Sequence, residues 1–298
     1  MEWDQINQKT LARPTAITKK TQVWRFLIYT KATEPAQLTY LSVQQYLNFL
    51  ADYYSPNTLG NHKASISSFC TYLLRCNALS YHPCRGAALP KAIVSPPDYL
   101  TDDECHRFIM AAEMHGVSLA IKIAIGTGMR RRELGHLQWS DIDLNRQLIQ
   151  VINKKTFLVK NRKCRVIPIL DRLYADLSNL HAAIHPEPAW YVITSRHQSA
   201  GGSAGRKPLG ARTLEKMLLP IKNIFPGRII TWRILRHTFA SLLAQNGVSY
   251  YKIAAWLGND PAICAKYYCN AGQRFDPDIN KLRDQESQPR KYSGKTIL

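Results

Sequence analysis

Residues 233–240 read Arg-Ile-Leu-Arg-His-Thr-Phe-Ala, and this pattern predicts an amphipathic helix over 232–246. Apolar side chains recur at the helical spacing i, i+4 and i+7, at Leu235, Phe239 and Leu242. A second face carries two guanidiniums and an imidazole, at Arg233, Arg236 and His237. Water or a phosphate must accept the donors of that face, because guanidiniums cannot accept hydrogen bonds themselves. Taken alone, the pattern is also typical of an ordinary basic helix surface.

A second segment, 127–134, reads Thr-Gly-Met-Arg-Arg-Arg-Glu-Leu and predicts a turn that leads into a helix. Arg130 falls in the first turn of that helix. Glu133 lies three residues later, on the same face, where its carboxylate can hold the guanidinium in position. The alternative interpretation is a solvated Arg–Glu pair with no further role.

A third segment, 257–270, contains Leu-Gly-Asn-Asp-Pro at its start. Gly258 predicts the end of one helix, and Asp260 followed by Pro261 predicts the beginning of the next. Tyr268 lies about two turns into this last helix. A tyrosine at such a position is usually part of the core, so the segment is informative only in combination with the other two.

The chain has 298 residues and a formal net charge of +19. So large an excess of basic residues favours an extended polyanion as partner over a small metabolite. A membrane surface is the competing polyanion, but the N-terminus does not resemble a signal peptide and no apolar run reaches roughly 18 residues. The seven cysteines lack CxxC and zinc-site spacing. We therefore expect free thiols in a reducing cytoplasm, and no metal or other cofactor.

Turn and breaker residues between 82 and 98 divide the chain. We expect a helical domain at 1–85, a linker at 86–98 and a second domain at 99–298 that ends in a polar tail, 270–298. The helices predicted in the first domain are 21–30, 42–53 and 57–77. A capping signature at Thr101 begins the first helix of the second domain, which continues with helices at 212–223, 232–246, 249–257 and 261–268.

The second domain also contains one strand-rich island, with strands predicted at 148–152, 157–159 and 165–169. These strands surround a basic run without a single acid, made of Lys154, Lys155, Lys160, Arg162, Lys163 and Arg165. The predicted fold class is therefore mainly α with a small antiparallel β-sheet.

In combination, the three segments and the lysine-rich hairpin resemble the tyrosine recombinase, or phage integrase, family. The resemblance covers nearly all of the second domain, and the first domain fits that family's all-helical, SAM-like core-binding domain. It implies an α+β catalytic domain that cuts and rejoins DNA at specific sites through a 3′-phosphotyrosyl intermediate. Such enzymes need neither metal nor ATP, and integration or excision of a mobile element is the role that we expect.

The resemblance assigns catalytic roles residue by residue. Arg130 and Arg236 match the two catalytic arginines, Lys160 matches the hairpin lysine that acts as general acid, and Tyr268 matches the nucleophile. Lys155 remains the alternative to Lys160, and Tyr267 is the alternative to Tyr268.

Two further members of the catalytic set depart from the family pattern. Arg233 stands where most members have His, and Asn259 stands where most have His or Trp. Both side chains can donate to a phosphate oxygen, but neither accepts a proton near neutral pH. A general base at these positions is therefore in doubt. Glu133 and His237 are expected to support the site.

The resemblance also implies double-stranded DNA as partner, self-association to a tetramer on DNA, accessory DNA-bending proteins and a cytoplasmic, nucleoid-associated location. Contacts to the DNA backbone are expected from Lys154, Lys155, Arg162, Lys163, Asn57 and Lys63. Two alternatives stay open. One is a catalytically degenerate, sequence-specific DNA-binding protein, and the other is a nicking-closing enzyme similar to type IB topoisomerases.

Overall fold

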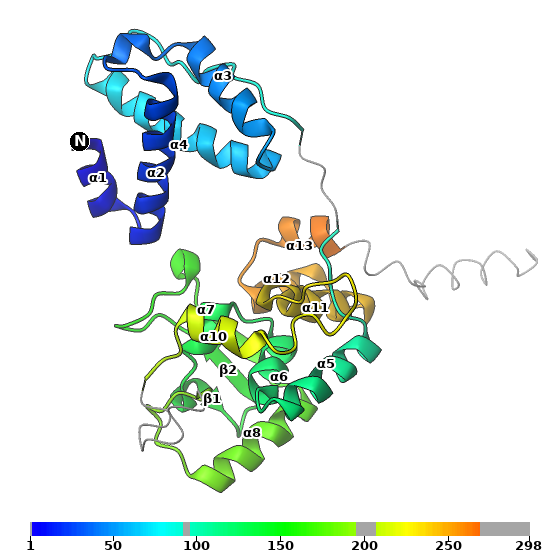
Figure 1. Ribbon diagram of the computed structural model, residues 1–298. Coiled ribbons are helices and arrows are strands. Elements are labelled where there is room, and N and C mark those ends of the chain that lie inside the picture. The colour runs from blue at the N-terminus through cyan, green and yellow to red at the C-terminus, as the bar shows by residue number, and fades with distance from the viewer. Residues whose placement is uncertain (1, 92–95, 195–206, 269–298) are drawn as a thin grey trace, which may run out of the picture. The chain divides into compact units, whose positions relative to one another are not determined.

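The chain forms two compact units, residues 1–95 and 96–298 (Figure 1). The computed structural model describes residues 2–91, 96–194 and 207–268. Part of the expected linker and the expected tail 270–298 lie outside the described residues. Asp98, which we expected in the linker, is joined to the second unit through an ion pair with Arg228.

The first unit consists of helices α1 (Glu2–Thr10), α2 (Arg13–Thr30), α3 (Tyr40–Ala51) and α4 (Pro56–Arg75), with the 3-10 helix η1 (Pro35–Gln37). Side-chain caps begin two of the helices, because Thr39 accepts from the backbone N–H of Ser42 and Ser55 from that of Thr58. The core gathers one apolar face from each long helix, with Phe26, Val43, Tyr46, Leu47 and Ile66 fully buried.

The N-terminal part of this unit is more helical than the sequence predicted. We expected no helix before residue 21, but α1 is present and α2 begins at Arg13. Helix α1 is mostly polar, and Trp3 is its one large buried apolar residue. The ring of Trp3 packs edge-on against the ring of Phe69, with the ring centroids 5.4 Å apart. Helical periodicity does not reveal a short helix that depends on a single buried aromatic side chain.

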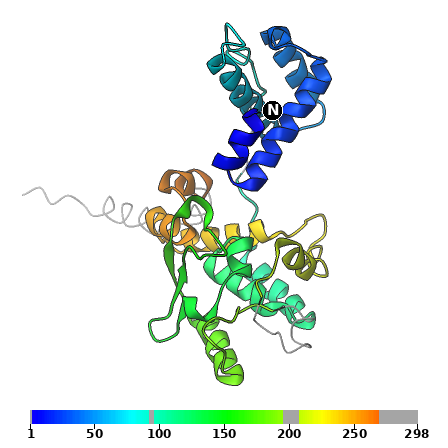
Figure 2. The same ribbon diagram turned by 90° about the vertical axis from the view of Figure 1, so that its left-hand side faces the viewer.

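The second unit contains most of the helices. They are α5 (Asp102–Met114), α6 (Ser118–Thr127), α7 (Arg131–Gly135), α8 (Asp171–Ile184), α10 (Ala211–Leu218), α11 (Trp232–Gln245), α12 (Tyr250–Leu257) and α13 (Pro261–Tyr268). Helix α8 was not predicted. Helix α11 packs against α6, α12 and α13, and both views place α8 at the opposite end of the unit from α13 (Figures 1 and 2).

A small antiparallel sheet covers one side of this helical core. Its order is β1 (Ile142–Asp143), β2 (Leu148–Val151) and β3 (Arg165–Pro168), with Ile149 opposite both Ile142 and Ile167. The predicted strand at 157–159 is wrong. Phe157 forms only an isolated bridge with Lys154, and the 3-10 helix η3 (Lys160–Arg162) follows directly. Phe157 and Val159 are buried in the core, which explains the apolar pattern that resembled a strand.

A buried carboxylate ties the sheet to the helices. Glu133 of α7 is 2% exposed and binds the guanidinium of Arg165 on β3 through two hydrogen bonds, of 2.5 and 3.1 Å. Arg165 in turn donates from Nε to the carbonyl of Trp256 on α12, at 2.6 Å. One ion pair therefore connects α7, β3 and α12. Arg165 belongs to the basic run expected to surround the strands, but its side chain is 4% exposed and lies in the interior.

No helix of the described residues is both long and apolar enough to cross a membrane.

We expect Glu133→Gln to lower the free energy of unfolding by about 3–5 kcal/mol, because it leaves the charge of Arg165 buried without its partner. Arg146→Ala is the control, since Arg146 forms a largely exposed pair with Asp143 and should cost no more than about 1 kcal/mol. Urea unfolding measures both. Equal effects of the two substitutions would contradict the structural role of Glu133.

The same carboxylate predicts an acid dependence of stability. Burial alone would raise the pKa of Glu133, but its hydrogen bonds and charge pairing with Arg165 and Arg130 outweigh burial, so the pKa lies below its ordinary value. The group therefore contributes stability above the pKa of an unfolded glutamate, and this contribution is lost as the pH falls through the lower, folded pKa. Glu133→Gln should remove that part of the acid dependence.

Candidate active site

One cavity of the second unit, with a volume of about 710 Å³, brings together all six side chains predicted to be catalytic. They come from the residue before α7, from η3, from α11, from the turn after α12 and from α13. The six are Arg130, Lys160, Arg233, Arg236, Asn259 and Tyr268. The fold therefore collects segments that are far apart in the sequence around a single space.

Arg130 immediately precedes α7 and is held by contacts with two other segments. Its Nη1 donates to Glu133 at 3.0 Å, and its Nη2 donates to the carbonyl of Gly258 and to Oδ1 of Asn259, both at 3.2 Å. Glu133 also accepts from the backbone N–H of Arg130 at 2.8 Å. Glu133 thus holds Arg130 at both its backbone and its side chain.

Arg236 projects from α11 toward the ends of α6 and α12. Its Nη1 donates to the carbonyl of Gly128 at 2.6 Å, and its Nη2 donates to the carbonyl of Leu257 at 2.8 Å and to Oδ1 of Asn259 at 2.9 Å. Gly128 ends α6 at a φ of +60°, and a Cβ there would lie 2.5 Å from Phe239. Glycine is therefore required at the turn that supplies this carbonyl.

Asn259 links the two arginines, because its amide oxygen accepts from both guanidiniums. The sequence predicts that Asn259 donates to a phosphate oxygen. In the structure its oxygen is instead used to fix the spacing of Arg130 and Arg236. An imidazole N–H or an indole N–H could not make this contact, because guanidiniums offer no acceptor.

Arg130 and Arg236 still have donors to offer to a ligand. Each uses three of its five N–H groups within the described part of the chain, which leaves Nε–H and one Nη1–H on each. Burial, together with the positive charge of Arg130, lowers the pKa of Arg236 to about 10. Such a shift means that the surroundings disfavour the cation, and a bound anion would reverse this.

Tyr268 is 2% exposed, and its hydroxyl lies 2.7 Å from Nδ1 of His237. Burial raises the pKa of Tyr268 to about 12, although the charge of Arg236 opposes this rise. The phenol is therefore protonated at neutral pH. Tyr267 lines the same cavity and is half-buried, so the cavity alone does not separate the two tyrosines, but the hydrogen bond to His237 belongs to Tyr268.

Lys160 is exposed on η3 and lines the cavity, whereas Lys155 is not among the residues that line it. The side chains of Lys155, Arg162 and Lys163 are exposed on the connection between β2 and β3. Arg162, two residues after Lys160, adopts a φ of +54°, in the left-handed region of the backbone. The geometry therefore favours Lys160 over Lys155 as the lysine of the site.

Lys154 does not fit its expected role in DNA binding. Its ammonium donates to the carbonyl of His136, to the amide oxygen of Gln138 and to the buried carboxylate of Asp141. A lysine has three N–H donors, so these contacts leave none for a phosphate. We therefore remove Lys154 from the DNA-binding set. In the first unit, Lys63 uses one donor on the carbonyl of Ala87, and Asn57 is exposed in the first turn of α4.

The residues that support the two arginines from the side away from the cavity are not evident in the sequence. Arg165, Gly128 and the carbonyl of Leu257 contact the site or its buried carboxylate. Backbone carbonyls leave no signal in the side-chain pattern. For Arg165 the usable signal was its place opposite Val151 on a strand that buries alternate residues.

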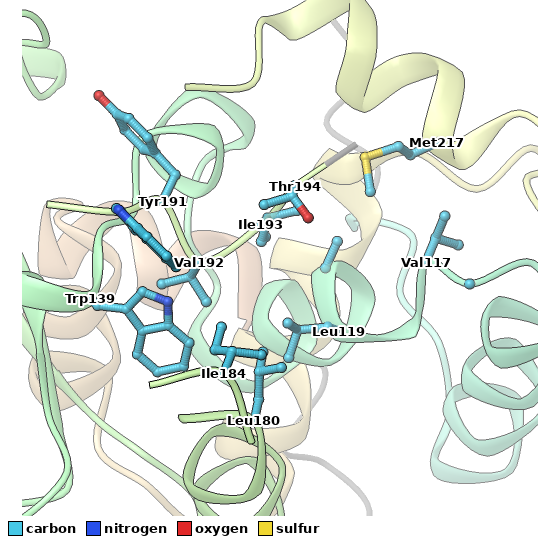
Figure 3. Close-up of a pocket in the computed structure, with 13 residues that line it drawn as sticks. Val117, Leu119, Trp139, Leu180, Ile184, Tyr191, Val192, Ile193, Thr194 and Met217 are labelled. Atoms are coloured by element: carbon cyan, nitrogen blue, oxygen red, sulfur yellow. The ribbon is translucent and has the colours of Figure 1, made fainter. Parts of the chain in front are cut away.

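A second cavity, of about 390 Å³, lies elsewhere in the same unit (Figure 3). Apolar and aromatic side chains dominate its lining, among them Trp139, Leu180, Ile184 and Met217. None of the described residues that line it carries a positive charge, so this lining does not offer what a phosphate requires. Within the described residues, no group of three or more His, Cys, Asp or Glu side chains could hold a metal ion.

Comparison with known proteins agrees with this arrangement. Residues 98–273 match the phage integrase family, which is more than half of the chain. The tyrosine recombinase XerC of Pediococcus pentosaceus is 27% identical over 84% of this chain and 80% of its own length. XerC of Listeria welshimeri is 26% identical over 79% of this chain and 78% of its own length.

Solved structures show the same fold. A lambda integrase fragment, in a dimer bound to a core site, covers 92% of this chain and 95% of its own with a TM-score of 0.73 at 19% identity. The Tn1549 transposon integrase, in complex with a circular intermediate DNA, covers 95% of this chain and 98% of its own with a TM-score of 0.70 at 15% identity. With its catalytic unit matched almost throughout, the chain belongs to the phage integrase family, the tyrosine recombinases that carry out site-specific DNA recombination.

Proposed function

We propose that the cavity holds one phosphodiester of duplex DNA and that Tyr268 attacks its phosphorus. The bond from Tyr268 Oη to phosphorus forms as the bond from phosphorus to the 5′-oxygen breaks. The DNA strand then stays joined to the protein through a 3′-phosphotyrosyl link. The phenol proton leaves to water, and Lys160 gives a proton to the 5′-oxygen. Reversal with another 5′-hydroxyl rejoins the strand.

The observation that carries this proposal is the paired arrangement of Arg130 and Arg236 around Asn259. Both guanidiniums line the cavity, each keeps two donors that are unused within the described residues, and a shared acceptor fixes the spacing of the two side chains. Negative charge grows on the equatorial oxygens during attack on phosphorus, and preorganised cations stabilise that charge. Arg233 and Lys160 add positive charge to the same cavity. Phosphoryl transfer therefore suits this site without a metal ligand set.

We further propose that the first unit and the catalytic unit bind the same duplex, the former through the 1–85 core-binding domain and the latter through 99–298. A lambda integrase has been solved as a tetramer on a Holliday junction. By analogy we propose a tetramer of this chain on DNA, at the nucleoid. The transposon integrase among the structural neighbours supports a role in moving a mobile element. We also propose accessory DNA-bending proteins as further partners.

Nicked duplexes that tile the DNA flanking the gene should trap a covalent protein–DNA adduct, since the nick lets the cleaved strand escape. Tyr268→Phe should abolish the adduct because it removes the attacking oxygen. Tyr267→Phe is the matched control and should retain it. Denaturing gels measure the adduct. Loss in Tyr267→Phe with retention in Tyr268→Phe would identify the wrong nucleophile, and specific binding without an adduct on any substrate would favour the degenerate DNA-binding protein.

The leaving-group role of Lys160 can be isolated with a substrate whose 5′-bridging oxygen is replaced by sulfur. A thiolate is a good leaving group without protonation, so this substrate does not need a general acid. Lys160→Met should slow cleavage of the oxygen substrate by about 100-fold or more. The same variant should cleave the sulfur substrate at nearly the wild-type rate. Lys155→Met is the control. If sulfur fails to rescue Lys160→Met, Lys160 is not the general acid.

Non-specific duplex DNA tests the contacts of the β2–β3 connection without knowledge of the target site. Lys155→Ala, Arg162→Ala or Lys163→Ala should each reduce the slope of log K against log salt by about 1. Lys154→Met should leave the slope unchanged and lower the urea midpoint instead, because it breaks a buried ion pair. If Lys154→Met changed the slope and the other three substitutions did not, the assignment of Lys154 to the interior and of the other three cations to DNA contacts would be wrong.

A further inference from the structure

Three side chains form a continuous line of hydrogen bonds that ends at the attacking oxygen. Nε of Arg233 donates to Nε2 of His237 at 3.2 Å, and Nδ1 of His237 lies 2.7 Å from the hydroxyl of Tyr268. Arg233 and His237 are one turn apart on α11, and Tyr268 comes from α13. Family resemblance marks His237 only as a supporting residue, and Arg233 is a departure from the family pattern.

The first contact determines which ring nitrogen of His237 carries the proton. A guanidinium nitrogen can only donate, so Nε2 must present its lone pair to Arg233. A neutral imidazole has one N–H, which must then be on Nδ1. It follows that Nδ1–H donates to the oxygen of Tyr268. The lone pair on Nε2 is used by Arg233, and the proton on Nδ1 is used by Tyr268. His237 therefore has no free lone pair with which to accept a proton from Tyr268.

We propose that Arg233 and His237 act together as positioning residues for the nucleophile, in which Arg233 fixes the Nδ1–H tautomer of His237 and His237 donates to Tyr268 Oη. The contact orients the oxygen and becomes stronger as the phenol loses its proton, because hydrogen bonds to a charged acceptor are stronger. The proposal deepens the function proposed above and rests on it. A histidine at position 233 would not fix the direction of the hydrogen bond to His237, since an imidazole can donate or accept. Arg233 can only donate.

The surroundings of His237 are consistent with a neutral ring. Burial, with the positive charges of Arg233 and Arg236, lowers the pKa of His237 to about 4, and the charge of Asp98 opposes this shift only in part. The charged and titratable groups near it among the described residues are those arginines of its own helix, Tyr268 of α13 and Asp98. A protonated ring would place an N–H of His237 against the N–H of Arg233.

The tautomer can be measured on the full chain without DNA. In protein labelled with 15N-histidine, the ring signals of His237 are those that disappear in His237→Asn. We expect a neutral ring with its proton on Nδ1 at pH 7. Arg233→Ala should shift the population toward Nε2–H, whereas Tyr268→Phe should leave the proton on Nδ1. A proton on Nε2, or on both nitrogens, in the wild-type chain would overturn the proposal.

Adduct formation on the nicked substrate then shows whether His237 acts as a hydrogen-bond donor or as a general base. His237→Asn can present an N–H close to the position of Nδ1 but cannot take up a proton, whereas His237→Asp offers a base and no donor. We expect Asn to keep the rate within about threefold of wild type, and Asp and Ala to lose roughly 10- to 100-fold. Retention by Asp with loss in Asn would show a general base and overturn the proposal.

Failure of the proposal and failure of the proposed function give different results. If the wild-type chain forms no adduct on any substrate, the function fails while the ring signals still report the tautomer. If the wild type forms the adduct and all three variants at His237 react at its rate, the positioning role is wrong and the function stands. Urea midpoints of the variants show whether a lost rate reflects unfolding, and the tautomer measurement decides for any variant that unfolds.

Discussion

The carboxylate of Glu133 is the interaction on which the architecture of the site depends. It is buried, and it accepts four hydrogen bonds, two from Arg130 and two from Arg165. Through Arg130 it reaches the cavity, and through Arg165 it reaches the sheet and the end of α12. A buried charge pair contributes little net stability, because desolvation offsets attraction. What this pair supplies is a fixed position for α7 relative to β3 and α12, and therefore for Arg130 relative to Gly258 and Asn259.

The balance of charge around the cavity follows from this arrangement. Glu133 is the carboxylate that binds Arg130, and it is shared with Arg165, so Arg236 is held by backbone carbonyls and by an amide oxygen that carries no charge. Within the described residues, Arg236 is thus held by neutral acceptors, whereas Arg130 shares the buried carboxylate of Glu133 with Arg165. A phosphodiester brings the missing negative charge, and the guanidiniums need not move to receive it. This is the preorganisation that electrostatic catalysis requires.

Much of this could be predicted from sequence, because the decisive signals are short and local. The helix 232–246 carries its apolar stripe and its cations at fixed spacing, and it was found within one residue of α11. The family match confirms the resemblance drawn from the motifs. The strand at 157–159 was wrong because two buried apolar residues in a turn resemble a short strand. The interior role of Lys154 could not be predicted, since a lysine in a basic run looks the same whether its partner is a phosphate or a buried carboxylate. For Arg165, only the alternation of buried residues along its strand indicates an interior position.

Arg233 and Asn259, which depart from the family pattern, change the hydrogen bonds of the site but still contribute to it. Asn259 accepts from the arginines, and Arg233 orders the histidine that contacts the nucleophile. The central claim is that this cavity joins DNA to Tyr268. Mass spectrometry of the trapped wild-type adduct tests it directly, because trypsin releases both candidate tyrosines in one peptide, 267–274, whose fragments distinguish them. The account predicts a nucleotide on Tyr268. A nucleotide on Tyr267, or on a residue outside the cavity, would contradict it.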